Sequence, residues 1–245
     1  MRIALIILTL FIFQSIKGQN NLADLRNYIE KTENVSNLSN LKTVKFDSLS
    51  ILTTFNELER QIDFGFEHQR ILVMPYSDWE LKLNLISKNG KIQIVWISEF
   101  DSSKEKHMNT LTIVKNSDFL KEYVQNHNEF YKTELTESDF EKQILDEYVV
   151  GFGCSIDGLD IPKESKKILK FVKKKNRKEL NKYLTSFSPE LQTLGTIGLL
   201  KIGKLTKKQK SIINHLKIKN SVIFSCSGCL YGIGETFNER IEYYE

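Results

Sequence analysis

Alternating hydrophobic and polar positions predict an antiparallel sheet in the first half of the chain. Apolar side chains occupy every second position in residues 79–85 and again in residues 92–96. An Asn-Gly pair at residues 89–90 lies between these runs, and it favours a hairpin because both residue types tolerate a positive φ. Residues 71–74 and 111–114 can add further strands. We therefore expect a meander with one buried face.

Apolar positions spaced three and four residues apart predict helices on either side of this sheet. A short amphipathic helix is expected over residues 20–32, and residues 55–62 read as a second short helix. From residue 117 onward the period is helical again. Ser138, with Glu141 three residues later, matches a capping box, so a helix is expected to begin there. Helices that pack on a meander give an α+β fold.

The chain beyond residue 163 reads as almost purely helical, although residues 222–224 could form a strand. Helices are expected over residues 163–175, 177–186, 189–203 and 207–219. The third of these is apolar around most of its circumference, which predicts that neighbouring helices bury it. Its two glycines, Gly195 and Gly198, allow another backbone to approach closely.

Residues 177–219 resemble a HEAT-type helical repeat, in which a short helix is followed by Ser-Pro and then by a buried helix. The residues that carry the resemblance are Leu180, Leu184, Pro189, Leu191, Gly195, Gly198 and Leu199. The resemblance implies a protein-interaction surface and carries over no catalytic residue. A small helical bundle is the alternative, because a solenoid needs three copies at a fixed period and these are not found.

The first eighteen residues have the anatomy of a secretory signal peptide. Arg2 supplies a positive start, residues 3–13 are apolar apart from Thr9, and a short polar stretch ends at Gly18. An apolar run of this length is well short of the roughly 20 residues that cross a bilayer. We expect cleavage after Gly18, export to a secreted or periplasmic location, and no transmembrane segment after cleavage.

A glycine-rich stretch and a change in the sign of the charge mark a domain boundary at residues 151–162. Residues 19–150 are expected to form an acidic α+β domain. Residues 163–245 are expected to form a basic helical domain that ends in a Cys-x-x-Cys tail.

Composition adds a strong charge asymmetry to this picture. The 245 residues are 40% hydrophobic and 27% charged, which is ordinary for a globular protein and excludes collagen-like, low-complexity and multi-span membrane classes. Residues 163–219 contain 17 basic and three acidic side chains, whereas the rest of the chain after residue 18 has a balance of −12. This distribution fits either intramolecular docking of the two domains or a basic face for an acidic protein partner.

The basic face of the helical domain is the candidate binding surface. Its residues are Lys173, Lys174, Lys175, Lys207 and Lys208. An ordinary solvated helix face is the alternative, since blocks of like charge are commonly solvent-facing. A nucleic-acid partner is not expected, because export separates the chain from it and few aromatic residues interleave with the basic ones.

Three cysteines offer the most specific chemistry: Cys154 at the boundary, and Cys226 and Cys229 near the end of the chain. A structural disulfide would join Cys226 to Cys229, or Cys154 to one of them, and the longer loop would contribute on the order of 2 to 4 kcal/mol. A redox-active Cys-x-x-Cys pair is a second interpretation, although no helix is expected after it to stabilise a thiolate. A metal site completed by His215 or Cys154 is a third. We adopt the structural disulfide.

Motifs for catalysis are not found in the sequence. It has no nucleophile elbow, no zinc-protease motif and no phosphate-binding loop. One cluster of titratable residues, Asp63 with Glu67, His68 and Arg70, reads as a polar loop before a strand. His127 lies on the apolar face of its expected helix and reads as a packed side chain.

These observations predict a secreted or periplasmic protein that acts by binding, without catalysis and without a cofactor or metal. The alternative from another class is a thiol-disulfide redox protein that uses Cys226 and Cys229.

Overall fold

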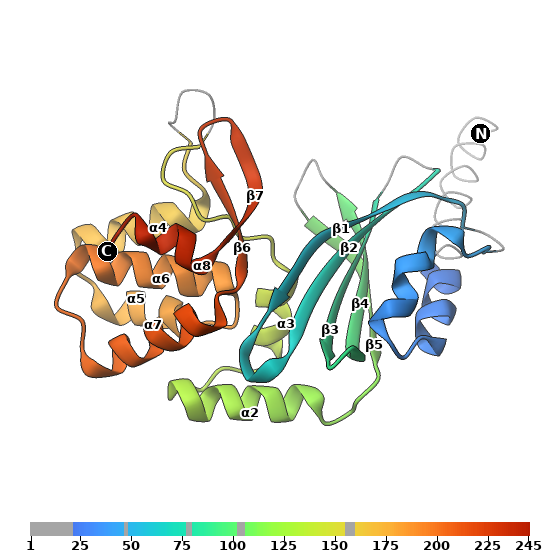
Figure 1. Ribbon diagram of the computed structural model, residues 1–245, viewed down its shortest axis with the longest axis horizontal. Coiled ribbons are helices and arrows are strands. Elements are labelled where there is room, and N and C mark those ends of the chain that lie inside the picture. The colour runs from blue at the N-terminus through green and yellow to red at the C-terminus, as the bar shows by residue number, and fades with distance from the viewer. Residues whose placement is uncertain (1–21, 47–48, 77–79, 102–105, 155–159) are drawn as a thin grey trace, which may run out of the picture. The chain divides into compact units, whose positions relative to one another are not determined.

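A computed structural model describes residues 22–46, 49–76, 80–101, 106–154 and 160–245 (Figure 1). The chain falls into two compact units, and each is described by itself. Unit 1 contains the described residues up to Glu57 together with His68–Ser117, and unit 2 contains Leu58–Glu67 together with Asp118–Glu245. The signal peptide expected at residues 1–18 lies outside the described residues.

The division into units differs from the boundary expected at residues 151–162, because the chain passes between units near residues 57, 67 and 117. The acidic domain over residues 19–150 and the basic domain over residues 163–245 therefore stay predictions.

Five strands form an antiparallel meander in chain order, which confirms the expected sheet. They are β1 (Ile51–Gln61), β2 (Glu67–Pro75), β3 (Glu80–Lys88), β4 (Lys91–Asp101) and β5 (Lys106–Val114). Lys88 pairs with Lys91, and Asn89 and Gly90 between them have φ values of 52° and 75°. The Asn-Gly turn therefore makes the hairpin that its residue types predict.

The short helix expected over residues 55–62 is wrong, since most of this segment belongs to β1. The buried positions at its end are Leu58, Arg60 and Ile62, which is the two-residue period of a strand. The middle position of this alternation is an arginine. The hydrophobic pattern alone therefore hides the strand.

The core of unit 1 lies on one face of the sheet. Leucines 81, 83 and 85 of β3 are fully buried there. They form one apolar cluster with side chains from the helix at residues 22–31 and from the 3-10 helix η1 (Val35–Thr43). The amphipathic helix expected over residues 20–32 is confirmed over its described part.

Unit 2 consists of helices, a β-hairpin and the end of β1 with the turn that follows it (Figure 1). Its helices are the 3-10 turn η2 (Asp63–Gly65), α2 (Phe119–Tyr131), α3 (Glu137–Leu145), α4 (Lys163–Lys173), α5 (Arg177–Leu184), α6 (Pro189–Ile202), α7 (Lys207–Lys219) and α8 (Phe237–Glu242). The start of α3 lies before Ser138, because Thr136 and Asp139 form the reciprocal capping box there.

The C-terminal part is not all-helical, which corrects the expected fold class. Strands β6 (Val222–Ser227) and β7 (Leu230–Thr236) form an antiparallel hairpin before α8. Residues 150–154, at the start of the predicted boundary, run parallel to β6: the Val150 N–H donates to the Phe224 carbonyl at 2.9 Å, and the Cys226 N–H donates to the Val150 carbonyl at 3.0 Å. These backbone bonds stabilise β6. Its partner β7 is glycine-rich and shows no hydrophobic alternation, so the sequence pattern does not predict this hairpin.

The central helix of unit 2 is α6, and it is buried from Pro189 to Leu199 as its apolar circumference predicts. Ser188 caps its first turn, because the Leu191 N–H donates to the Ser188 hydroxyl. A Cβ atom added at Gly195 would lie 2.2 Å from the Leu184 nitrogen, so the backbone of α5 packs directly against this glycine. The close backbone approach expected at the two glycines is present at Gly195, whereas Gly198 faces only side chains of Leu180 and Ile168.

Candidate functional site

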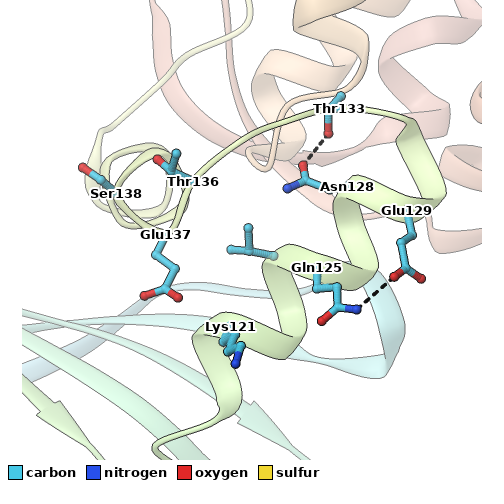
Figure 2. A pocket seen from close by; sticks show the side chains of 9 residues that line it. Lys121, Gln125, Asn128, Glu129, Thr133, Thr136, Glu137 and Ser138 are labelled. Carbon is cyan, nitrogen blue, oxygen red and sulfur yellow. Dashed lines mark hydrogen bonds between the residues drawn. The ribbon is translucent and has the colours of Figure 1, made fainter.

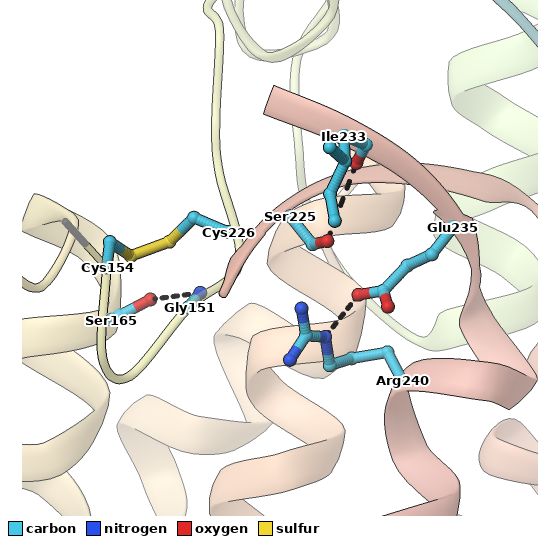
Figure 3. Close-up of a disulfide and its surroundings, with 8 residues drawn as sticks. All are labelled: Gly151, Cys154, Ser165, Ser225, Cys226, Ile233, Glu235 and Arg240. Atoms are coloured by element: carbon cyan, nitrogen blue, oxygen red, sulfur yellow. Dashed lines mark hydrogen bonds and ion pairs between the residues drawn. A yellow bond between two sulfur atoms is a disulfide. The ribbon is translucent and has the colours of Figure 1, made fainter. Parts of the chain in front are cut away.

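A disulfide joins Cys154 to Cys226 in unit 2 (Figure 3). Both sulfur-bearing residues are buried, and Gly151 packs so closely that an added Cβ would meet both Sγ atoms within 3 Å. The Gly151 N–H in turn donates to the Ser165 hydroxyl at 3.3 Å, which connects this segment to α4. The disulfide is therefore buried, with the backbone at Gly151 packed against it, as expected for a structural bond.

The third cysteine, Cys229, is free and exposed in the turn between β6 and β7. Of the pairings that the sequence leaves open, the structure contains the one from the boundary segment to the hairpin. Cys226 and Cys229 are not bonded to each other.

The titratable cluster expected around Asp63 is divided in the structure. In unit 1, His68 and Arg70 both contact the Asn84 side-chain oxygen, at 3.1 and 2.8 Å. Asp63 belongs to unit 2, where it contacts residues more than 60 positions away along the chain. Sequence proximity therefore does not identify its partners.

Asp63 lies at the turn η2 and is the centre of a buried polar network. Its Oδ1 accepts from Lys219 Nζ at 2.8 Å and contacts His215 Nε2 at 3.0 Å, and its Oδ2 accepts from the Tyr131 hydroxyl at 3.1 Å. Gln192 closes the network, because its Oε1 accepts from Lys219 at 2.9 Å and its Nε2 donates to Tyr131.

Electrostatics keep this aspartate ionised. Burial by itself would raise the pKa of Asp63, but the charge of Lys219 and the hydrogen bonds from His215 and Lys219 hold it well below its usual range. Burial and the neighbouring Asp63 charge raise the pKa of Tyr131, so its hydroxyl stays protonated. With only 1% of its side chain exposed, Asp63 is a support for its neighbours and does not meet a solvent-borne ligand.

The neighbour that does reach solvent is His215, whose side chain is 32% exposed. It lies in a shallow groove of about 590 Å³ along α7. The groove is lined by Phe130, Lys207, Lys210, Ser211, Asn214, His215 and Ile218. The sequence analysis did not predict this groove. Its signal in the sequence is Ile218, an apolar residue that lies outside the buried stripe of Ile212, Ile213 and Leu216 and therefore faces solvent.

The predicted basic residues gather at one end of the unit 2 helices, where the turn between α4 and α5 meets the turn between α6 and α7. The Arg177 guanidinium donates to the Gly203 carbonyl, and Gln209 Nε2 donates to Asn181 Oδ1 at 2.8 Å. We call this surface the lysine end. It consists of Lys173, Lys174, Lys175, Lys204, Lys207 and Lys208.

All six lysines of the lysine end are exposed, and none has an ion-pair partner among the residues that the structure describes. Other basic residues of the same segment are paired: Lys167 with Glu164, Lys182 with Glu179, Lys217 with Glu245 and Lys219 with Asp63. Exposed lysines with no ion-pair partner among the described residues also lie along the helices, for example Lys163, Lys166, Lys170 and Lys178, and the lysine end is the group of six around the two turns.

A larger depression of about 800 Å³ lies between α2 and the start of α3 (Figure 2). Its polar groups are mostly occupied by local structure. Asn128 Oδ1 accepts from the Thr133 hydroxyl and the Leu135 N–H, Gln125 donates to Glu129, and Thr136 belongs to the α3 capping box. This surface is a crease between helices whose donors and acceptors hold the loop.

No family model, curated protein or solved structure matches this chain. Within the described part of the chain, no group of three or more His, Cys, Asp or Glu side chains is placed to hold a metal ion. None of the described helices is long and apolar enough to cross a membrane.

Proposed function

We propose that the protein acts by binding, and that the lysine end of unit 2 is the surface that an acidic protein partner contacts. The observation that carries this proposal is a cluster of exposed lysines without an ion-pair partner in the described chain. Like charges held together repel one another, and carboxylates of a partner relieve that repulsion while they steer the encounter.

The helical surroundings support an interaction role. The pair α5 and α6 combines a Ser-Pro cap with a glycine at which the two helices pack backbone to backbone. We keep the HEAT-type resemblance as part of this proposal, since such helix pairs present their turns and outer faces to partners.

An extracytoplasmic location is also part of the proposal. The Cys154–Cys226 disulfide supports it, because disulfides persist in oxidising compartments and are rare in the cytosol. The signal-peptide anatomy of residues 1–18 points the same way.

The test is binding of a fluorescent deca-glutamate peptide, followed by anisotropy at several salt concentrations. We expect the triple reversal Lys173→Glu, Lys174→Glu and Lys175→Glu to weaken binding at least about 10-fold, because attraction becomes repulsion. The matched control reverses Lys31, Lys42 and Lys45, which are exposed lysines of unit 1 with the same change in net charge. Equal losses in both triple variants would show that only overall charge matters, and the proposal would be rejected.

A second candidate is thiol-disulfide exchange, and the free, exposed thiol of Cys229 three residues after Cys226 supports it. The Cys229 thiolate would attack Cys226 Sγ, and Cys154 would leave as a thiolate that takes up a proton. The product would be a Cys226–Cys229 disulfide. Burial of Cys226 opposes that attack, so binding is the function we prefer.

A further inference from the structure

We infer that the groove on α7 gives the lysine end its specificity, by receiving an apolar side chain from an acidic peptide segment of the partner. This inference rests on the proposed function and names the chemistry of the partner. Lys207 belongs to both the groove and the lysine end, so one ligand can occupy the two surfaces together.

The groove is built on one face of α7. Its lining residues on this helix are 207, 210, 211, 214, 215 and 218, which repeat every three or four positions. The opposite wall is Phe130 at the end of α2, whose ring centroid lies 4.6 Å from that of His215. The groove therefore runs along about three turns of helix, or roughly 16 Å at about 1.5 Å per residue.

One end of the groove is apolar and open to solvent. The side chain of Ile218 is 86% exposed and that of Phe130 is 43% exposed. Both lie beside His215 on the groove wall. Covering these exposed apolar side chains removes apolar surface from water, which favours an aliphatic or aromatic side chain as the occupant.

The other end of the groove is basic. Lys207 and Lys210 are exposed and have no ion-pair partner among the described residues. Ser211 and Asn214 lie between the two ends and can form hydrogen bonds with a peptide backbone. The groove thus has a direction, with an apolar end at Ile218 and a cationic end at Lys207 and Lys210.

The spacing of the two ends sets the spacing of the ligand. Ile218 and Lys210 are eight residues apart, or about 12 Å along the helix. An extended peptide covers about 3.3 Å per residue. The ligand that fits therefore carries an apolar side chain and a group of acidic residues beginning three or four positions away.

The floor of the groove is fixed before any ligand arrives. His215 is held by Asp63, and Asp63 is held in turn by Lys219 and Tyr131. Because these buried hydrogen bonds already hold His215, this side chain loses little conformational freedom on binding, and such preorganisation favours affinity.

The experiment uses three fluorescent peptides of equal length. Peptide A is Ser-Phe-Ser-Ser-Glu-Asp-Glu, peptide B has Ser in place of Phe, and peptide C has Ser in place of the three acids. We expect the protein to bind peptide A at least about 10-fold more tightly than peptide B, and peptide C least of all. Replacement of Ile218 by Ser is expected to lower the affinity for peptide A to the level of peptide B. The affinity for peptide B is expected to stay the same.

The matched control is Tyr243→Ser, which removes an apolar side chain that is 80% exposed elsewhere in unit 2. We expect this variant to bind all three peptides as the unchanged protein does. The double reversal Lys207→Glu and Lys210→Glu is expected to weaken the binding of both acidic peptides, A and B.

The outcomes separate the two proposals. Equal affinity for peptides A and B, or no effect of Ile218→Ser, overturns the proposed role of the groove. In that case the proposed role of the lysine end stands if reversal of residues 173–175 still weakens the binding of both peptides. If the binding of peptide A depends on Ile218 but is unchanged by reversal of residues 173–175, the proposed role of the lysine end is overturned instead. Failure of the acidic peptides to bind the unchanged protein rejects both.

Discussion

Single buried polar residues determine how unit 2 responds to pH. Each oxygen of the Asp63 carboxylate accepts a hydrogen bond or contacts a cation, so the cost of burying this charge is offset locally. His127 has a different environment. Its ring lies 4.1 Å from that of Phe187 and 4.4 Å from that of Tyr131, and the hydrogen-bond contact of its Nε2 is the uncharged Ser186 carbonyl. Burial lowers the pKa of His127 from 6.5 to about 4.

We expect the free energy of unfolding to fall as the pH drops from 6.5 to 4. The unfolded chain takes up a proton on His127 near pH 6.5, whereas the folded chain does so only near pH 4, so the stabilisation is complete above pH 6.5 and is lost on acidification. The pKa shift corresponds to about 3 kcal/mol. Urea denaturation at pH 7.5 and pH 4.5 measures this difference.

Replacement of His127 by Phe keeps an aromatic ring at this position and removes the titration. The loss of stability between the two pH values is expected to be smaller in this variant than in the unchanged protein. An equal loss in the two proteins would show that other groups cause the pH dependence. His127→Gln serves as a second variant if the phenylalanine does not fold.

Elements in unit 2 are joined by close backbone contacts as well as by apolar side chains. The helices α5 and α6 meet at Gly195, where an added Cβ would lie 2.2 Å from one backbone atom and 2.8 Å from two others. At Gly198 the added Cβ would meet only side chains, with Leu180 Cδ2 closest at 2.4 Å. Side chains can rotate away from such a contact, whereas a packed helix backbone has to shift as a whole.

We therefore expect Gly195→Ala to destabilise the fold by roughly 1 to 3 kcal/mol, the usual range for overpacking. The better helix propensity of alanine offsets less than about 1 kcal/mol of this cost. Gly198→Ala is the matched control and is expected to cost less. Denaturant unfolding of both variants gives the comparison, and a larger loss at Gly198 would contradict the packing described for α5 and α6.

Local signals predicted elements well, and long-range contacts explain the failures. The hairpin of β3 and β4 follows from an Asn-Gly turn, and the burial of α6 follows from its apolar circumference. Strand β1 was hidden because its first half shows no apolar alternation, with Leu52 and Phe55 exposed, and because an arginine, Arg60, fills a buried position near its end. The cluster of Asp63 with His215 could not be inferred, since the two residues are 152 positions apart and only the fold brings them together.

At the scale of the whole molecule, the disulfide connects residues 72 positions apart and closes a covalent loop of the chain. The backbone of residues 150–154 runs along β6 beside it, so hydrogen bonds and the covalent bond restrain the same two segments. Such a crosslink acts mainly by limiting the freedom of the unfolded chain.

Replacement of Cys154 by Ser is expected to lower the free energy of unfolding by about 2 to 4 kcal/mol, because the unfolded chain regains this freedom. Cys229→Ser is the control and is expected to change it by less than about 0.5 kcal/mol, since its side chain is exposed. Thermal and urea unfolding measure both. Two results together would favour the exchange function. The Cys154→Ser protein would be as stable as the unchanged protein, and a peptide map of the unchanged protein would contain a Cys226–Cys229 bond.

The disulfide also makes residues 154–226 a closed covalent ring that contains α4, α5, α6 and α7. A protease that cuts one peptide bond inside this ring produces a nicked molecule and releases no fragment. Every lysine of the proposed binding surface lies within the ring. The surface thus stays attached to the rest of the chain after a single cleavage.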